Sequence, residues 1–427
     1  MRSSLSRTPG AAARAAGAGA LALAGAGALA ALARRGVLRN GVPDAPRAPL
    51  ADHFEEYELA ANRRYKRVAW ALAAAGTALV PAGAIAVAAS GPRWRPTLAR
   101  LAGGRPWRAG LAFGAGTTIA GAAAGLPLAV ARYAWGRRGG LVVQPARGWI
   151  ADVGKEVALE AGAAGLLGMA AGELMARRPT DWWAGVAALS GVAGLAIVVL
   201  SPIVVEPLFQ RTEPLRDREL ADRILELARL LGVPARSVLV NDASRRTTAS
   251  NAYVSGVGPS RHVVLFDTLL RDHPPEQVRF VVAHELAHVA RRHLMRSVVW
   301  SGAFAAPASL ALFALAGWRT GFAAPPSGRE GSDLLLRRLA IAGAGAAVLG
   351  TAAAPAANWL SRAHEREADW TALRATGDPA AGAALQRDLV LRSRGVPDPP
   401  RWVRFWFGSH PDALERIGLA LRAGAGA

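Results

Sequence analysis

The chain has 427 residues, of which 52% are hydrophobic and 19% are charged, and its mean hydropathy is +0.20. Soluble domains carry about a quarter charged residues, so this composition excludes a wholly soluble protein, and its apolar content excludes a disordered one. The net charge of +20 does not indicate nucleic-acid binding, because the arginines flank apolar stretches and do not form one basic stripe. Cysteine is absent, which excludes disulfides and cysteine-ligated zinc.

Long apolar segments alternate with charged segments along the chain. A helix needs about 20 residues to cross the hydrocarbon core of a bilayer. Seven runs approach or exceed this length, namely Ala15–Ala33, Val68–Pro92, Ala109–Ala131, Val157–Met175, Trp182–Val205, Ser297–Trp318 and Leu339–Ser361. We therefore predict about seven transmembrane helices.

The first run has an alternative interpretation as a cleaved signal peptide, because Arg2, Arg7 and Arg14 precede a short apolar stretch. No small-x-small cleavage site stands out before Arg34, so we favour a retained span.

Glu160 and Glu173 interrupt the run at Val157–Met175. Either both lie near helix ends, in contact with water, or they face a water-filled cavity within the membrane, since acidic groups there seldom face lipid. The sequence leaves both interpretations open.

Two polar regions follow the fifth run, at residues 210–296 and 362–427. Because two apolar runs separate them, both regions lie on the same face of the membrane. In the first region, helical spacing covers Leu215–Leu231, and short strands are predicted at Ser237–Val240, Ala252–Val257 and His262–Phe266. A second helix is predicted to begin at Pro275.

A candidate metal site lies on that second helix, at His284-Glu285-Leu286-Ala287-His288. Residues four apart share a helix face, so His284 and His288 can bind one zinc ion, and Glu285 can activate water as a general base. The alternative is a pair of histidines near the lipid headgroups.

A third protein ligand is needed to leave the fourth position open for water. One zinc-protease class supplies a histidine six residues after the motif, but Leu294 stands there and His293 is one place short. The other class supplies a glutamate from a later helix. Glu365 and Asp369 share one helical face, so Glu365 can bind zinc while Asp369 holds a ligand imidazole, and Glu367 points elsewhere. The alternative is a charged surface helix, but Glu365 lies on the same membrane face as the motif histidines.

These residues resemble the membrane-integral CAAX prenyl protease 1 family of zinc metalloendopeptidases, whose bacterial relatives include HtpX-type proteases. The resemblance covers residues from about 200 to 420 and is only architectural before that. Its motifs are Pro207–Leu215, Ser250–Tyr253, Val263–Leu269, Ser361–Asp369 and Ser409–Ile417, with His293 at a matching position.

The resemblance implies one zinc ion per chain, bound by His284, His288 and Glu365, with Glu285 activating water. It also implies a hydrated chamber surrounded by the spans.

Further roles follow from the same resemblance. His410 and Arg416 are expected near the zinc, where they stabilise the oxyanion or the zinc ligands, and Asn251 and Ala252 on an edge strand that pairs with the substrate backbone. Each has a plainer alternative: His410 as a cap of the helix starting at Asp412, Arg416 as a surface cation, and Asn251 as a turn residue.

Two features differ from what prenyl proteases of this family carry. Ala249 stands where they commonly have a histidine, and the alanine-rich spans give little sign of a specific lipid groove. The leading hypothesis is a CAAX prenyl protease-like endopeptidase. The alternatives are an HtpX-like quality-control protease of misfolded membrane proteins and a non-catalytic scaffold or transporter that retains the fold.

The expected fold is predominantly α, a multi-pass membrane protein with a gluzincin-type zinc protease domain containing a small β-sheet. Lysine and arginine are more abundant between spans on the catalytic side, which predicts a cell-membrane protein with a cytoplasmic catalytic face. The expected partners are a membrane-associated peptide or protein substrate and the lipid bilayer, without nucleic acid. The expected divisions are an N-terminal membrane region (1–209), a catalytic insertion (210–296), a two-span hairpin (297–361) and a C-terminal catalytic segment (362–427).

Overall fold

The structure is a computed structural model that describes residues 41–425. It is predominantly helical, as predicted. The α-helices are Glu56–Ala89 (α2), Gly91–Ala102 (α3), Pro106–Arg138 (α4), Ala146–Arg177 (α5), Trp182–Leu200 (α6), Glu206–Phe209 (α7), Arg218–Leu230 (α8), Asp267–Asp272 (α9), Pro275–Ala290 (α10), His293–Thr320 (α11), Gly328–Thr376 (α12), Pro379–Arg392 (α13), Arg401–Phe407 (α14) and Ala413–Gly424 (α15).

Within the described residues, six helices are long and apolar enough to cross a membrane. They are α2, α4, α5, the continuous stretch Trp182–Phe209, α11 and α12, and they match six of the seven predicted runs. The seventh prediction, Ala15–Ala33, lies outside the described residues.

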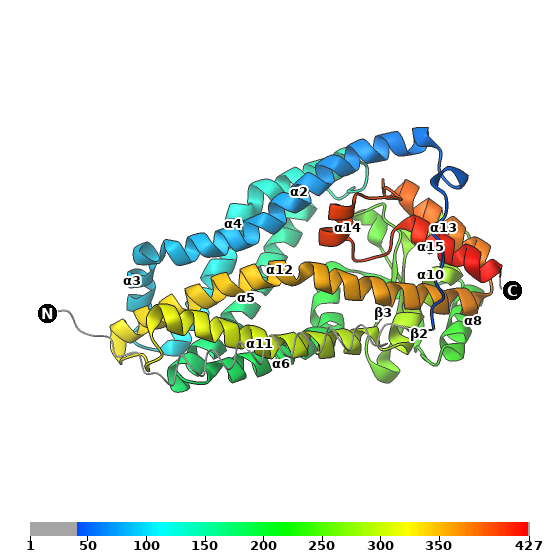
Figure 1. The fold of residues 1–427 in the computed structure, drawn as a ribbon. Coiled ribbons are helices and arrows are strands. Elements are labelled where there is room, and N and C mark those ends of the chain that lie inside the picture. The colour runs from blue at the N-terminus through cyan, green and yellow to red at the C-terminus, as the bar shows by residue number, and fades with distance from the viewer. Residues whose placement is uncertain (1–40, 426–427) are drawn as a thin grey trace.

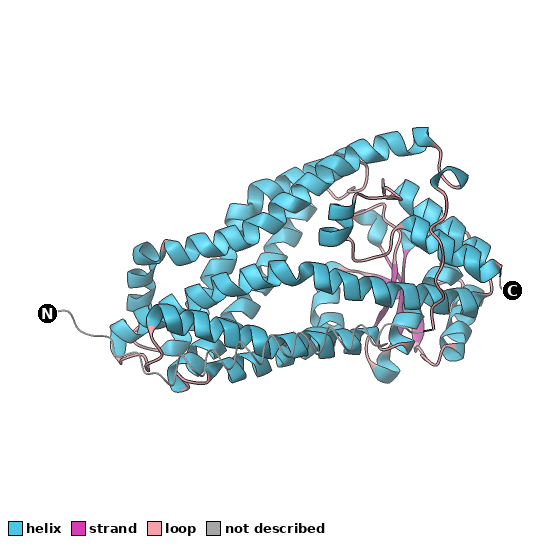
Figure 2. Cartoon of the chain, in the orientation of Figure 1, coloured by secondary structure: helices cyan, strands magenta, loops and turns pink. Residues whose placement is uncertain are grey.

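The long helices run side by side along the molecule, and the polar elements gather at one end (Figure 1). That end holds α8, α10, α13 and α15 together with the strands, which Figure 2 shows as one small group. The two regions predicted to share a membrane face therefore meet in space.

Helix α12 connects the membrane part to the polar end without a break. Its 49 residues correspond to about 74 Å at 1.5 Å per residue, more than twice the hydrocarbon thickness. The apolar stretch Leu339–Ser361 consequently continues straight into Glu365 and Asp369.

Helices α4 and α5 approach each other closely through small residues. A Cβ atom at Gly110 would lie 2.0 Å from the carbonyl oxygen of Gly168, and one at Gly114 would lie 2.0 Å from that of Ala164. Small residues at such spacing allow close backbone packing between membrane helices.

The acidic residues of α5 differ in position. Glu173 lies near the helix end, where its Oε1 accepts a hydrogen bond from the Trp107 amide at 3.2 Å and its Oε2 lies 3.0 Å from Arg177 Nε. This agrees with the first of the two interpretations for Glu173. Glu160 lies mid-helix with an exposed side chain, and its role stays a prediction.

The sheet has four strands in the order β1-β2-β4-β3. They are Thr212–Pro214 (β1), Ser237–Asn241 (β2), Ala252–Ser255 (β3) and His262–Phe266 (β4). Strands β2 and β4 are parallel, while the two outer pairs are antiparallel. The last three strands were predicted, whereas β1, three residues long and ending in a proline, was not.

A hydrophobic core joins this sheet to the helices around it. Buried residues come from every layer, including Leu227 of α8, Leu265 of β4, Leu286 of α10, Leu385 of α13 and Leu419 of α15. This core fixes α10 against the sheet and against α12.

Candidate metal centre

Helix α10 carries the His-Glu-x-x-His motif. Pro275 occupies the first turn, where its missing N–H costs no hydrogen bond. His284 and His288 lie one turn apart, and their Nε2 atoms are 3.1 Å from each other. The helix ends at Ala290, and Arg292, with a φ of 54°, turns the chain into α11.

Glu365 approaches both imidazoles from α12. Its Oε2 lies 3.3 Å from His284 Nε2, and its Oε1 lies 3.4 Å from His288 Nε2. One ligand atom from each of the three residues lies within 4.8 Å of the others. The structure thus brings together the three residues predicted to bind a metal.

The separations of these donors suit a zinc ion. In a tetrahedral site with bonds of about 2.05 Å, neighbouring ligand atoms lie about 3.3 Å apart. The closest approaches here are 3.1, 3.3 and 3.4 Å. In addition, Glu365 Oε2 is buried without a well-formed hydrogen bond among the described residues. Two imidazoles and a carboxylate are also the donors that zinc accepts.

Glu285 adjoins this cluster on the same helix and is partly buried. Burial, opposed by neighbouring His284 and reinforced by Glu365, raises the pKa of its carboxyl group. A raised pKa brings a carboxylate closer to the range in which it can take and return a proton.

The second ring nitrogen of His284 is held by a carboxylate. Its Nδ1 lies 2.9 Å from Asp369 Oδ1, and Arg416 donates two hydrogen bonds to Asp369, at 2.7 and 2.6 Å. Burial lowers the pKa of His284, but the nearby carboxylates of Asp369 and Glu365 outweigh it and raise the pKa to about 10. Arg416 is therefore no surface cation: its side chain is only 13% exposed and holds Asp369 behind His284.

Comparison with known proteins identifies this arrangement. Residues 214–423 match the model of peptidase family M48. We call this matched region the M48 domain. All three candidate ligands, Glu285, Asp369 and Arg416 lie inside this domain.

Two relatives and one solved structure extend the comparison. The uncharacterized metalloprotease YhfN of Bacillus subtilis is 30% identical over 258 residues, which cover 57% of this chain and 57% of that protein. CAAX prenyl protease 1 of Saccharomyces cerevisiae is 33% identical over 155 residues, which cover 36% of this chain and 34% of that protein. The matches therefore span little more than half of the first relative and a third of the second.

The crystal structure of S. mikatae Ste24p has the same fold. It superimposes with a TM-score of 0.74 at 20% identity, and the match covers 96% of this chain and 97% of that chain. The six long apolar helices and the relatives above support a multi-pass membrane protein.

Asp369→Asn should weaken metal binding by the M48 domain about 10- to 100-fold, the usual effect of removing a carboxylate behind a ligand imidazole. Competition with a fluorescent zinc chelator measures this affinity. Asp222→Asn, on the exposed side of α8, is the control and should leave it unchanged. Equal affinities in the two variants would show that Asp369 does not support the metal centre.

The far nitrogen of His288 meets a histidine whose role the sequence did not reveal. His293 Nδ1 lies 2.9 Å from His288 Nδ1, and His293 Nε2 lies 3.1 Å from Glu367 Oε2. Arg296 donates to the same oxygen at 2.7 Å. Glu367 does point away from the ligand face, as predicted, but it is buried behind His293. The one sequence signal for this contact was that His293 and Glu367 each lie within a few positions of a candidate metal ligand.

His410 approaches the cluster from the segment before α15. Its Nε2 lies 3.4 Å from Glu365 Oε2, and Ser409 Oγ lies 2.9 Å from its Nδ1. The cap of α15 is Asp412, which accepts a hydrogen bond from the Glu415 amide at 3.0 Å. His410 therefore does not cap this helix.

Asn251 and Ala252 lie at the open edge of the sheet. Asn251 immediately precedes β3, and the outer side of β3 has no strand partner among the described residues. The Phe266 amide donates to the Asn251 carbonyl at 3.0 Å. Because backbone groups alternate in direction along an antiparallel pair, the N–H and C=O groups of Ala252 and Val254 point away from β4.

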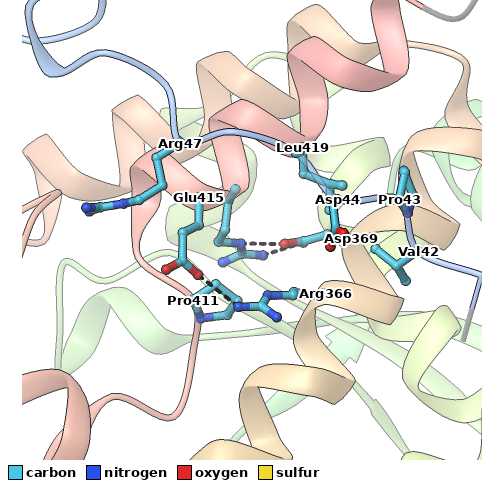
Figure 3. A pocket seen from close by; sticks show the side chains of 11 residues that line it. Val42, Pro43, Asp44, Arg47, Arg366, Asp369, Pro411, Glu415 and Leu419 are labelled. Atoms are coloured by element: carbon cyan, nitrogen blue, oxygen red, sulfur yellow. Dashed lines mark hydrogen bonds and ion pairs between the residues drawn. The ribbon is translucent and has the colours of Figure 1, made fainter. Parts of the chain in front are cut away.

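A strap formed by residues 41–54, outside the M48 domain, crosses the C-terminal segment. Arg47 donates to both oxygens of Asp412, at 3.3 and 2.9 Å, and the Ala48 amide donates to the Leu414 carbonyl at 3.0 Å. Strap and domain enclose a cavity of about 220 Å³, whose lining includes Asp369 (Figure 3). Asp412 also accepts from Arg404 at 2.9 Å. The strap thus holds the turn between His410 and Arg416.

Arg47→Ala should loosen the strap, because the buried carboxylate of Asp412 loses a bidentate partner at a cost of about 1–2 kcal/mol. Limited proteolysis within residues 41–54 is expected to speed up several-fold. Arg64→Ala, exposed on α2, is the matched arginine control. Identical cleavage rates in both variants would argue that Arg47 does not hold the strap.

Proposed function

We propose that the chain is a membrane-integral zinc metalloendopeptidase that hydrolyses peptide bonds of membrane-associated substrates, as a CAAX prenyl protease 1 homologue. The observation that carries this proposal is the convergence of His284, His288 and Glu365 on one point beside Glu285. The family and the relatives described above support it.

In this proposal His284, His288 and Glu365 hold one zinc ion. When bound, zinc supplies Lewis acidity, which polarises the scissile carbonyl group and lowers the pKa of water. Asp369 fixes the orientation of the His284 ring through Nδ1, and Arg416 holds Asp369 in place. His293 likewise fixes the orientation of the His288 ring through Nδ1.

The remaining steps belong to side chains of the domain. Glu285 accepts a proton from the attacking water on its carboxylate and returns it to the leaving amine. His410, with its Nε2 beside Glu365, donates a hydrogen bond to the oxyanion that develops on the substrate.

The substrate is proposed to bind as an extended chain along β3. The outward backbone groups of Ala252 and Val254 offer up to four hydrogen bonds to a peptide added at this edge, and Asn251 lies where such a peptide enters. This mode of binding depends on an unfolded backbone rather than on particular side chains.

The proposed location is the cell membrane, with the catalytic face in the cytoplasm. Residues 34–67 carry eight lysines and arginines in the sequence, and the start of α2 lies at the catalytic end (Figure 1). Protease protection of residues 210–296 in right-side-out vesicles tests this orientation, and digestion there would contradict it.

Product analysis by mass spectrometry tests the function. The purified protein is given a farnesylated C-a-a-X peptide and, separately, a non-prenylated unfolded membrane-protein fragment, with Glu285→Ala as the blank. Cleavage of the prenylated peptide next to its modified cysteine would support prenyl-protein processing despite Ala249. Cleavage of the unmodified fragment alone would indicate quality control. If the zinc-loaded protein cuts neither, the endopeptidase proposal is wrong and a scaffold becomes the better hypothesis.

A further inference from the structure

A chain of four hydrogen-bonded side chains lies behind the entry to β3. Ser250 Oγ lies 3.0 Å from His273 Nε2, and His273 Nδ1 lies 2.6 Å from Gln277 Oε1. Gln277 Nε2 donates in turn to Asp388 Oδ2 at 2.9 Å. His273 and Gln277 are only 6% and 5% exposed, so the middle of this chain is shielded from water.

The carboxylate at one end fixes the direction of the bonds along the chain when the His273 ring is neutral. Because Asp388 accepts, the amide nitrogen of Gln277 must face it, and the amide oxygen must face His273. His273 therefore carries its proton on Nδ1, which leaves Nε2 as an acceptor. The Ser250 hydroxyl hydrogen is consequently directed inward, onto His273.

The segment that this chain anchors is short, and each of its residues has its own hydrogen bond. Ala249 is fixed through its carbonyl by Thr268 Oγ1 at 2.7 Å, and Asn251 by the Phe266 amide. Ser250 lies between them. Strand β3 has only four residues and one strand neighbour, so its backbone depends on these anchors at its start.

The relay also links the edge strand to the metal centre. Gln277 and His284 are both on α10, seven residues and hence about two turns apart on one face. A single helix thus sets the position of two of the three candidate zinc ligands and, through Gln277 and His273, that of Ser250.

We propose that Ser250, His273, Gln277 and Asp388 form a positioning relay that holds the start of β3 in register for the substrate backbone. The inference rests on the endopeptidase function proposed above. The relay acts through Asn251 and Ala252 and takes no part in bond cleavage. It predicts a defect in substrate binding without a defect in metal binding.

The test compares two serine–histidine pairs of the same sheet. Ser250→Ala breaks the relay, whereas Ser237→Ala breaks the pair between Ser237 Oγ and His262 Nδ1, 2.8 Å apart, away from the entry to β3. Loss of one such hydrogen bond should raise KM for an extended peptide about 3- to 10-fold in Ser250→Ala, with kcat and zinc content unchanged. Ser237→Ala should match the wild type, and Ser250→Thr, which keeps the hydroxyl, should restore KM.

Amide hydrogen exchange provides a readout that does not need activity. Exchange across residues 252–255 should accelerate in Ser250→Ala and not in Ser237→Ala or Ser250→Thr. Unchanged exchange and KM in Ser250→Ala would overturn the relay, as would a loss of zinc from this variant. If the wild-type protein cleaves no peptide but exchange is still faster in Ser250→Ala, the relay is supported as an anchor of β3, and only the proposed function is refuted.

Discussion

Glu285→Gln is expected to lower kcat at least about 10²-fold while KM and zinc content stay unchanged. Glutamine has nearly the same size and shape, but it cannot accept a proton from water. Glu285 is not one of the three converging donors, so its replacement leaves the metal cluster intact. Steady-state kinetics with a cleavable peptide measure kcat and KM, and metal analysis of the same preparation measures the zinc content.

Glu276→Gln is the matched control for this variant. Glu276 lies on the exposed first turn of the same helix, so the same chemical change there should leave kcat at the wild-type value. Substantial turnover by Glu285→Gln would remove Glu285 from its assigned role as the base.

Glu365→Ala is expected to abolish stable metal binding and, with it, hydrolysis. The substitution removes the one anionic donor and leaves two imidazoles of a single helix turn, so affinity should fall by more than the roughly 100-fold that loss of an outer partner costs. Zinc per chain after dialysis against a weak chelator is the measurement.

Glu330→Ala, on the exposed first turn of α12, removes a glutamate from the same helix and should retain the wild-type zinc content. A Glu365→Ala protein with one tightly bound zinc ion would contradict the ligand assignment and would direct the search to another carboxylate.

Much of the fold follows from local patterns in the sequence. Six described spans match apolar runs, because hydrophobic length is the property that the bilayer selects. The strands at residues 237, 252 and 262 were found from short β-branched stretches between turn residues. The approach of Glu365 to His284 and His288 was predicted from the number of spans between them, since an even number returns the chain to the same face.

The missing parts depend on pairs that no local pattern marks. Arg47 and Asp412 are 365 positions apart, Gln277 and Asp388 are 111 apart, and His293 and Glu367 are 74 apart. The sequence marks His293 but not its partner, and in all three pairs only the three-dimensional packing selects which residues meet. Strand β1 was not predicted for a related reason. Three residues ending in Pro214 form a strand only because β2 lies beside them.

The strap of residues 41–54 has a consequence for the biosynthesis of the protein. The ribosome makes the chain from its N-terminus, so Arg47 emerges long before the carboxylate that it holds. His410 and Arg416 are among the last residues of the described chain to be made, and the strap bonds to Asp412 and Leu414, which lie between them. The candidate metal centre is therefore completed after the membrane helices have been made, and a nascent chain carries its motif histidines before Glu365, His410 and Arg416 are present. The proposed endopeptidase would therefore be inactive while it is being made.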